Sequence, residues 1–201
     1  MRLSMITAVS AAAVLAAGAA HAQADAHAGH HQPAPAAAAG QFSDADLKAF
    51  DDAAKKVKAI ADGVQGGAPS AEQQQQMSAA VEASGLGVEK YNAIATAVSK
   101  DPVMRARVAV ASAPASPAGS VGATATDAEL AQFSAAMAKL REINKGVNGT
   151  PTAEQQQQMT STVESSGMAV DRFNAIATAL PQDARLRARV ELADAHRAAG
   201  H

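Results

Sequence analysis

One segment occurs twice in this chain and indicates its architecture: Ser70-Ala-Glu-Gln-Gln-Gln-Gln-Met77. It returns 82 residues later as Thr152-Ala-Glu-Gln-Gln-Gln-Gln-Met159. Asn92-Ala-Ile-Ala-Thr-Ala97 returns at the same separation, as residues 174–179. Self-similarity at a fixed separation indicates an internal repeat. The chain therefore contains two copies of one structural unit.

Upstream of these segments the separation between equivalent residues changes by one. Phe50 matches Phe133 and Ile60 matches Ile143, in both cases 83 residues later. One residue is therefore lost just before the second copy of the glutamine-rich segment. Because insertions and deletions are tolerated mainly in surface loops, this position marks a loop between two helices.

Each copy has the apolar spacing of a short helical bundle. In the first helix of the first copy, apolar residues recur at steps of three and four, which is typical of an amphipathic helix, and Ser43 is the expected N-cap. A second helix follows Ser70, whose hydroxyl forms a capping box with Gln73. A third helix spans residues 88–98, and a fourth begins at Asp101-Pro102.

The fold class that follows is all-α, with two tandem homologous modules of three to four helices behind a disordered N-terminal leader. The chain has 201 residues, 48% hydrophobic but only 2% aromatic, so alanine supplies most of the apolar content. Modules this small bury little surface, so the two copies either pack together or self-associate. The expected core of the first module is Leu47, Phe50, Val57, Ile60, Met77, Val81, Tyr91, Ile94 and Met104.

The N-terminus has the pattern of a secretory signal peptide. Residues 1–24 hold one charge, Arg2, then an apolar run and small residues at positions 20, 22 and 24. Cleavage after Ala22 and cleavage after Ala24 both fit the pattern. No later segment is apolar enough to span a bilayer, and the absence of cysteine excludes a lipid anchor. We expect a periplasmic or secreted protein.

Composition divides the rest of the chain into segments. Residues 25–40 form a leader rich in His, Pro and Ala, expected to be disordered. The first helical module covers residues 41–110, and an Ala/Ser/Pro/Gly linker covers 111–124. The second module covers residues 125–195 and a short tail covers 196–201.

The leader contains the one candidate metal site. If cleavage follows Ala24, the mature chain opens Asp25-Ala26-His27. Its α-amine, two deprotonated backbone amides and the His27 imidazole form a square-planar nitrogen set that suits Cu(II) or Ni(II). His30 and His31 are further imidazole ligands nearby. Cleavage after Ala22 abolishes this arrangement, and a simple solubilising leader is the alternative.

Composition and spacing argue against several other functions. A net charge of -2 supplies no basic field for nucleic acid, and without cysteine there is no thiolate chemistry. In the recurring arginine motif, Arg105-Ala-Arg107 and Arg187-Ala-Arg189, the first arginine lies four residues after Asp101 or Asp183. We expect a helix cap and an i,i+4 pair on an exposed face there, and an anion site is the alternative. No nucleophile–base pair, phosphate loop or cofactor fingerprint is visible, so catalytic residues and cofactors are not predicted.

A family resemblance rests on four motifs of the first copy. The motifs are Phe42-Ser-Asp-Ala-Asp-Leu-Lys-Ala-Phe50, Val81-Glu-Ala-Ser-Gly85, Tyr91-Asn-Ala-Ile94 and Asp101-Pro-Val-Met-Arg105. In this order they resemble domain-of-unknown-function family 4168, a family of secreted bacterial helical proteins. Both copies look like members, although the second has Ala125 in place of the Phe42 aromatic. The resemblance implies an exported all-α domain and no catalytic residue.

The function that these observations favour is a non-catalytic, exported helical module that binds a protein partner or another copy of itself. The alternatives are a periplasmic chaperone and a Cu(II)- or Ni(II)-binding protein acting through the N-terminal leader. A chaperone needs an exposed apolar groove, and an enzyme needs a polar pocket with a perturbed titratable group.

Overall fold

The computed structural model describes residues 41–64, 68–147 and 149–200. The expected signal peptide and leader lie outside these residues. Within the described residues all regular secondary structure is helical, which confirms the all-α class. The chain divides into two compact units, one ending at Asp101 and the other beginning at Pro102.

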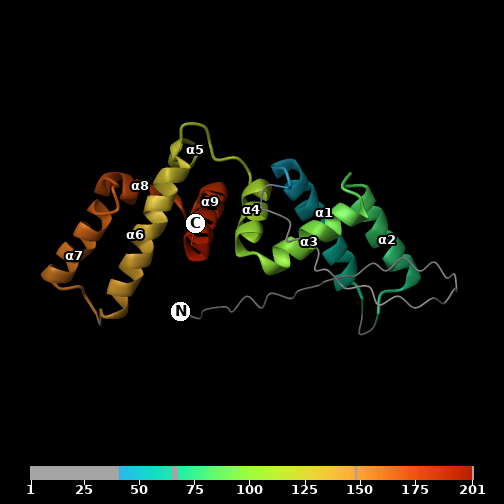
Figure 1. Ribbon diagram of the computed structural model, residues 1–201, viewed down its shortest axis with the longest axis horizontal. Coiled ribbons are helices and arrows are strands. Elements are labelled where there is room, and N and C mark those ends of the chain that lie inside the picture. The colour runs from blue at the N-terminus through green and yellow to red at the C-terminus, as the bar shows by residue number, and fades with distance from the viewer. Residues whose placement is uncertain (1–40, 65–67, 148, 201) are drawn as a thin grey trace, which may run out of the picture. The chain divides into compact units, whose positions relative to one another are not determined.

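The first unit contains α1 (Asp44–Asp62), α2 (Ala71–Glu82) and α3 (Val88–Lys100). α2 packs on α1, and α3 contacts both (Figure 1). The expected caps are confirmed: the hydroxyl of Ser43 accepts from the backbone N–H of Asp46, and Ser70 forms a capping box with Gln73. Gly87, with φ of 71°, reverses the chain before α3 in a conformation that favours glycine.

The core of the first unit contains the apolar residues that the spacing predicts, except Met104, which is buried but lies in the second unit. Val57, Met77 and Val81 form a buried cluster, with Ile60 and Tyr91 partly buried beside it. The Phe50 and Tyr91 rings lie 5.0 Å apart between centroids. Leu47 and Ile94 are fully enclosed.

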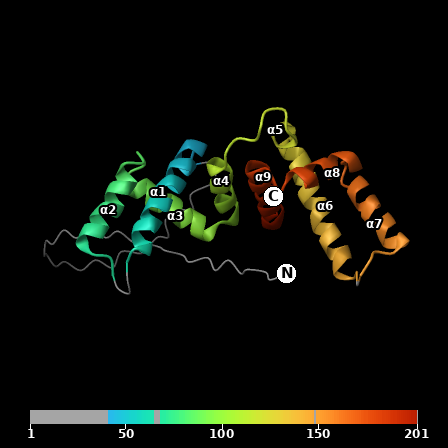
Figure 2. The same cartoon turned by 180° about the vertical axis from the view of Figure 1, so that it is seen from behind.

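The second unit is built around α9. Its elements are α4 (Pro102–Ser112), α5 (Val121–Thr124), α6 (Asp127–Lys145), α7 (Ala153–Glu164), α8 (Val170–Ala179) and α9 (Ala184–Ala199). α9 lies between α4 and α6 in both views, and it packs against both helices (Figures 1 and 2). The buried cluster of this unit consists of Ala125, Leu130, Phe133, Ala136, Val163, Met168, Phe173, Ile176 and Leu186.

The boundary of the compact units differs from the expected boundary of the first module at residue 110. By sequence α4 is the fourth helix of the first repeat, and α9 is the equivalent helix of the second. In the structure α4 groups with the second unit, where these two equivalent helices pack on each other. Periodicity shows that a helix has an apolar face but not which helix covers that face, so this pairing was not predicted.

The expected linker and tail are also more ordered than their composition indicates. Within residues 111–124, Ser120 caps the short helix α5, and the segment belongs to the second unit. At the C-terminus α9 continues through the expected tail to Ala199 and ends at Gly200, with φ of 84°. Among the helices that the structure describes, none has the length and apolar character needed to cross a membrane.

Candidate functional site

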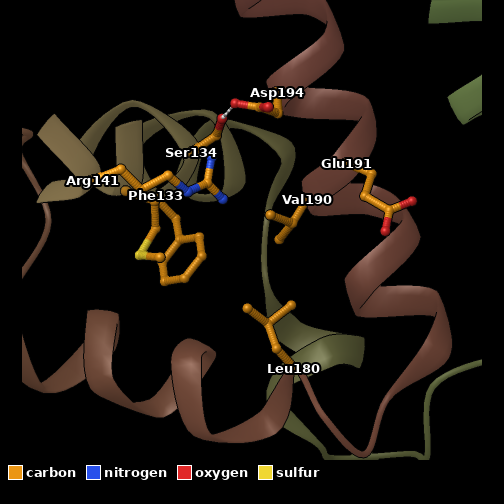
Figure 3. Close-up of a pocket in the computed structure, with 8 residues that line it drawn as sticks. Phe133, Ser134, Arg141, Leu180, Val190, Glu191 and Asp194 are labelled. Atoms are coloured by element: carbon orange, nitrogen blue, oxygen red, sulfur yellow. Dashed lines mark hydrogen bonds between the residues drawn. The ribbon is translucent and has the colours of Figure 1, made fainter. Parts of the chain in front are cut away.

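A small pocket lies in the second unit between α6 and α9 (Figure 3). Its volume is about 190 Å³. Four apolar side chains and four polar ones line it: Phe133, Met137, Leu180 and Val190, with Ser134, Arg141, Glu191 and Asp194. The pocket thus combines an apolar surface with ionised groups.

Helical periodicity explains why these side chains meet. Phe133, Met137 and Arg141 follow one another at steps of four along α6, so they share a face of that helix. Glu191 and Asp194 are three residues apart on α9, and Leu180 lies just beyond the last residue of α8. The site therefore requires three helices to come together.

Ser134 and Asp194 connect α6 to α9. The Ser134 hydroxyl, which is 2% exposed, donates to Asp194 Oδ1 at 3.0 Å. Arg197 donates to the same oxygen from Nη2 at 2.7 Å and from Nε at 3.2 Å. These hydrogen bonds, that of Arg197 foremost, outweigh burial and hold the pKa of Asp194 below its usual value. The carboxylate therefore stays ionised and is a weak base.

Arg141 supplies a positive charge at the rim of the pocket. Its side chain is exposed, and in Figure 3 it extends toward Ser134 and Asp194. Its charge contributes to the lowered pKa of Asp194. Among the residues that the structure describes, no carboxylate forms an ion pair with Arg141. The guanidinium is thus available to an anion from outside the chain.

The first repeat shows how an equivalent cation is normally neutralised. Lys58, which matches Arg141, pairs with Asp62 one turn later at 2.6 Å. The second repeat has Lys145 at the position of Asp62, and Lys145 pairs with Glu142 at 2.7 Å. Exchange of an acid for a base has therefore removed the local partner of Arg141.

Glu191 contributes to the pocket through its stem. In Figure 3 its carboxylate points away from Arg141 and Phe133. The side chain is exposed to solvent. The negative charges near the pocket are thus either paired, as in Asp194, or directed outward.

A second polar cluster holds the α4–α6 connection, residues 113–126, against the start of α9. Asp183 is 8% exposed, and its Oδ1 accepts from Ser116 Oγ at 3.0 Å and from the backbone N–H of Leu186 at 2.9 Å. Burial acts to raise the pKa of Asp183, but these hydrogen bonds and the charge of Arg185 outweigh it and lower that pKa. Gly122 lies so close that an added Cβ would overlap Asp183 Oδ2.

Two arginines of α9 complete this cluster. Arg185 Nη1 donates to the carbonyl of Val110 at 3.2 Å, at the C-terminal end of α4, where a cation complements the helix dipole. Arg189 donates to the carbonyls of Gly122 at 3.1 Å and Ala125 at 2.8 Å. All of these contacts lie within the unit, so the cluster is structural.

The recurring arginine motif therefore has a role that its spacing did not predict. Arg189 is mostly buried and fastens the start of α6 to α9, partly through an ion pair with Asp127 at 2.6 Å. Arg187 is exposed, as expected, but it donates to the carbonyl of Pro181 at 3.1 Å. Asp183 is the cap that its position predicts.

Both repeats tie their first helix to their third with an ion pair. Asp46 contacts Lys90 at 2.6 Å, and Glu129 contacts Arg172 Nε at 2.8 Å and Nη2 at 3.1 Å. The cation, assisted by the capping residue, lowers the pKa of each carboxyl to about 2. These pairs are partly exposed and serve the fold.

The predicted metal ligands Asp25, His27, His30 and His31 lie outside the described residues. Within the described ranges, no cluster of three or more His, Cys, Asp or Glu side chains is placed to hold a metal ion.

Sequence reasoning missed the α6/α9 pocket. The signal that pointed to it is the exchange of Asp62 for Lys145 between the repeats.

Two segments, residues 65–108 and 150–190, match the model of one family, described as Domain of unknown function (DUF4168). Each segment begins before the second helix of a repeat and ends within the fourth, so the first helices fall outside it. Of the residues that line the pocket, only Leu180 and Val190 lie within a matched segment. No curated protein and no solved structure matches the chain.

Proposed function

We propose that this chain, which carries two tandem segments that match DUF4168, is a non-catalytic, exported helical binding module that docks a partner polypeptide at the α6/α9 pocket. The observation that carries the proposal is a pocket with an apolar wall beside Arg141, a cation that forms no ion pair with a carboxylate among the described residues. This combination offers both a place for an apolar group and an exposed positive charge beside it.

The chemistry of the pocket favours binding over catalysis. A general base must accept a proton near neutral pH, but the pKa of Asp194 lies below its usual value because Arg197 and Ser134 stabilise the carboxylate. Ser134 donates to this carboxylate, and the residues that line the pocket include no histidine to activate its hydroxyl. The polar pair therefore orders the pocket and leaves Arg141 as the group available to a partner.

The size of the pocket favours a protein partner over a free metabolite. Dedicated small-molecule sites usually span about 300–1,000 Å³, whereas this pocket measures about 190 Å³. A cavity of roughly 150 Å³ is enough for benzene. One large apolar side chain therefore fills the space, as an anchor residue does at a protein interface.

Export belongs to the same proposal. The signal-peptide pattern of residues 1–24 supports secretion to the periplasm or beyond, and the small pocket supports a defined anchor rather than the broad apolar groove of a chaperone. Metal binding by the leader is a separate proposal. Copper titration of protein that begins at Asp25, compared with its His27→Ala variant, tests it.

Site-specific photo-crosslinking tests the docking proposal. A photoreactive residue in place of Glu191, at the rim of the pocket, is compared with the same residue in place of Glu164, which is exposed on α7 of the same unit. In the native envelope the Glu191 position should give one reproducible crosslinked polypeptide, displaced by excess unmodified protein. Identical crosslinking patterns from the two positions would contradict the proposal.

A further inference from the structure

We propose that the α6/α9 pocket recognises the C-terminal residue of its partner polypeptide, with an apolar side chain in the pocket and the terminal carboxylate on Arg141. This inference rests on the proposed docking function and names the chemistry of the docked group. A C-terminal residue carries both features on one Cα, so a single residue meets a small apolar pocket and the cation beside it.

Arg141 places a positive charge at the rim of the pocket. A guanidinium binds a carboxylate with two parallel hydrogen bonds, a geometry that a neutral carbonyl does not reproduce. Arg141 has no carboxylate partner among the described residues. Its equivalent, Lys58, is neutralised by Asp62. The anion-accepting position is thus a feature of the second repeat.

The two acids that line the pocket do not prevent a terminal carboxylate from binding to Arg141. Asp194 is neutralised by Arg197, and Ser134 donates to it as well. The Glu191 carboxylate points away from Arg141 (Figure 3). The first repeat lacks this second acid, because Ala109 stands at the position equivalent to Glu191.

The apolar part of the pocket determines which side chain the C-terminal residue of the partner can carry. Phe133, Met137, Leu180 and Val190 offer a surface without hydrogen-bonding side-chain groups, so a leucine-like or phenyl side chain is preferred over a polar one. The volume of about 190 Å³ accommodates either. Leucine is the natural first probe.

The test is a titration of the full chain with acetyl-Gly-Gly-Leu, followed by two-dimensional amide NMR. The C-terminal amide of the same peptide removes only the charge, and 4-methylvalerate presents a carboxylate without a peptide. The free acid should perturb residues of α6 and α9 and should bind up to about fivefold more tightly than the amide, as befits a partly exposed ion pair. Added salt should reduce this preference.

Variants of the protein show which residue causes the preference for the free acid over the amide. Arg141→Gln should remove the preference for the acid, while Lys58→Gln, the matched change in the first repeat, and Glu164→Gln, at an exposed position on α7 away from the pocket, should retain it. Unchanged amide spectra away from the pocket establish that each variant is folded. Arg141→Lys provides a second check, since it keeps the charge and should keep part of the preference.

Three outcomes overturn the inference. Equal binding of acid and amide, or an acid preference that persists in Arg141→Gln, excludes recognition of the carboxylate by Arg141. Binding of 4-methylvalerate that is tighter than that of the peptide would show that the site takes a free carboxylate and disfavours a polypeptide. A partner that crosslinks at position 191 without any acid preference in the peptides leaves the docking function standing and removes only its C-terminal chemistry.

Discussion

Lys58 in the first repeat and Arg141 in the second occupy equivalent turns of α1 and α6, yet only the lysine has an acid one turn later. Lys58 pairs with Asp62, whereas the residue equivalent to Asp62 is Lys145. An exposed i,i+4 pair stabilises a helix by only a few tenths of a kcal/mol, so its loss costs the fold little. The comparison teaches that one exchange can leave a cation on a helix face without an acid one turn later at small cost in stability.

The contacts that hold the helices together changed much less. Both repeats begin their first two helices with capping boxes. Both place two aromatic rings against each other, Phe50 with Tyr91 and Phe133 with Phe173, at 5.0 and 4.8 Å. The two repeats therefore differ mainly in their polar side chains and share the contacts of their cores. Three measurements of stability test this comparison.

The largest effect is expected for Gly122→Ala, in the part of the second unit that precedes α6. The added Cβ would overlap Asp183 Oδ2 and approach Ser116 Oγ to 2.7 Å. Overpacking of this kind costs about 1–3 kcal/mol, and we expect the upper part of that range because Asp183 is buried and holds the cap of α9. Urea denaturation followed by circular dichroism measures the loss.

The control for this substitution is Ala123→Ser, at an exposed neighbour in the same short helix. It should change the free energy of unfolding by less than about 0.5 kcal/mol. If Gly122→Ala were as neutral as this control, residues 113–126 would behave as the flexible linker that their composition indicates, and the observed packing of this segment would be refuted.

A smaller effect is expected for Arg189→Ala, compared with Arg187→Ala in the same motif. Arg189 satisfies the carbonyls of Gly122 and Ala125, and a buried acceptor left without its donor costs about 1–3 kcal/mol. Arg187 is exposed, so its removal should cost less than about 0.5 kcal/mol. Thermal denaturation of the two variants measures the difference, and equal melting temperatures would contradict the role assigned to Arg189.

The smallest effect concerns acid stability and the ion pairs that both repeats share. The pKa values of Asp46 and Glu129 are about 2 in the folded chain, below their ordinary values of 3.8 and 4.5. A depressed folded pKa stabilises the protein above the ordinary pKa, and this contribution is lost as the pH falls from about 5 toward 2. Each pair contributes below about 1 kcal/mol because it is partly exposed.

Glu129→Gln should therefore lower the free energy of unfolding at pH 6 and have little effect at pH 2. Asp46→Asn should do the same to a smaller extent, because Lys90 makes one hydrogen bond with Asp46 whereas Arg172 makes two with Glu129. Denaturation curves recorded between pH 2 and pH 7 check both. A Glu129→Gln effect that is the same at both ends of this range would show that the pair is not the cause.

Much of the fold followed from local patterns. Ser43 and Ser70 cap the helices they were expected to cap, and Leu47, Met77, Val81 and Ile94 are buried as predicted. These features depend on residues three or four apart, whose relation a helix fixes. Ile60 and Tyr91 are only partly buried, because they lie at the edge of their cluster.

The pocket could not be predicted from such local patterns. Phe133 and Val190 belong to different helices, and only the packing of α6 on α9 brings them together. Asp194 and Ser134 are 60 residues apart. No local spacing predicts a hydrogen bond at that separation. The exchange of Asp62 for Lys145 indicates that Arg141 has no acid one turn later, but it does not show that a pocket lies beside Arg141.

The sequence by itself determined the repeat, the helical class and the caps, since each depends on self-similarity or on contacts within a turn or two of helix. The tertiary structure alone decided that α4 packs on α9, and that the apparent linker is held by Asp183, Arg185 and Arg189. The physical reason is that backbone carbonyls such as those of Val110 and Gly122 accept hydrogen bonds from any donor that reaches them. Which donor does so is set by the folded chain and not by the identity of the residues that carry the carbonyls.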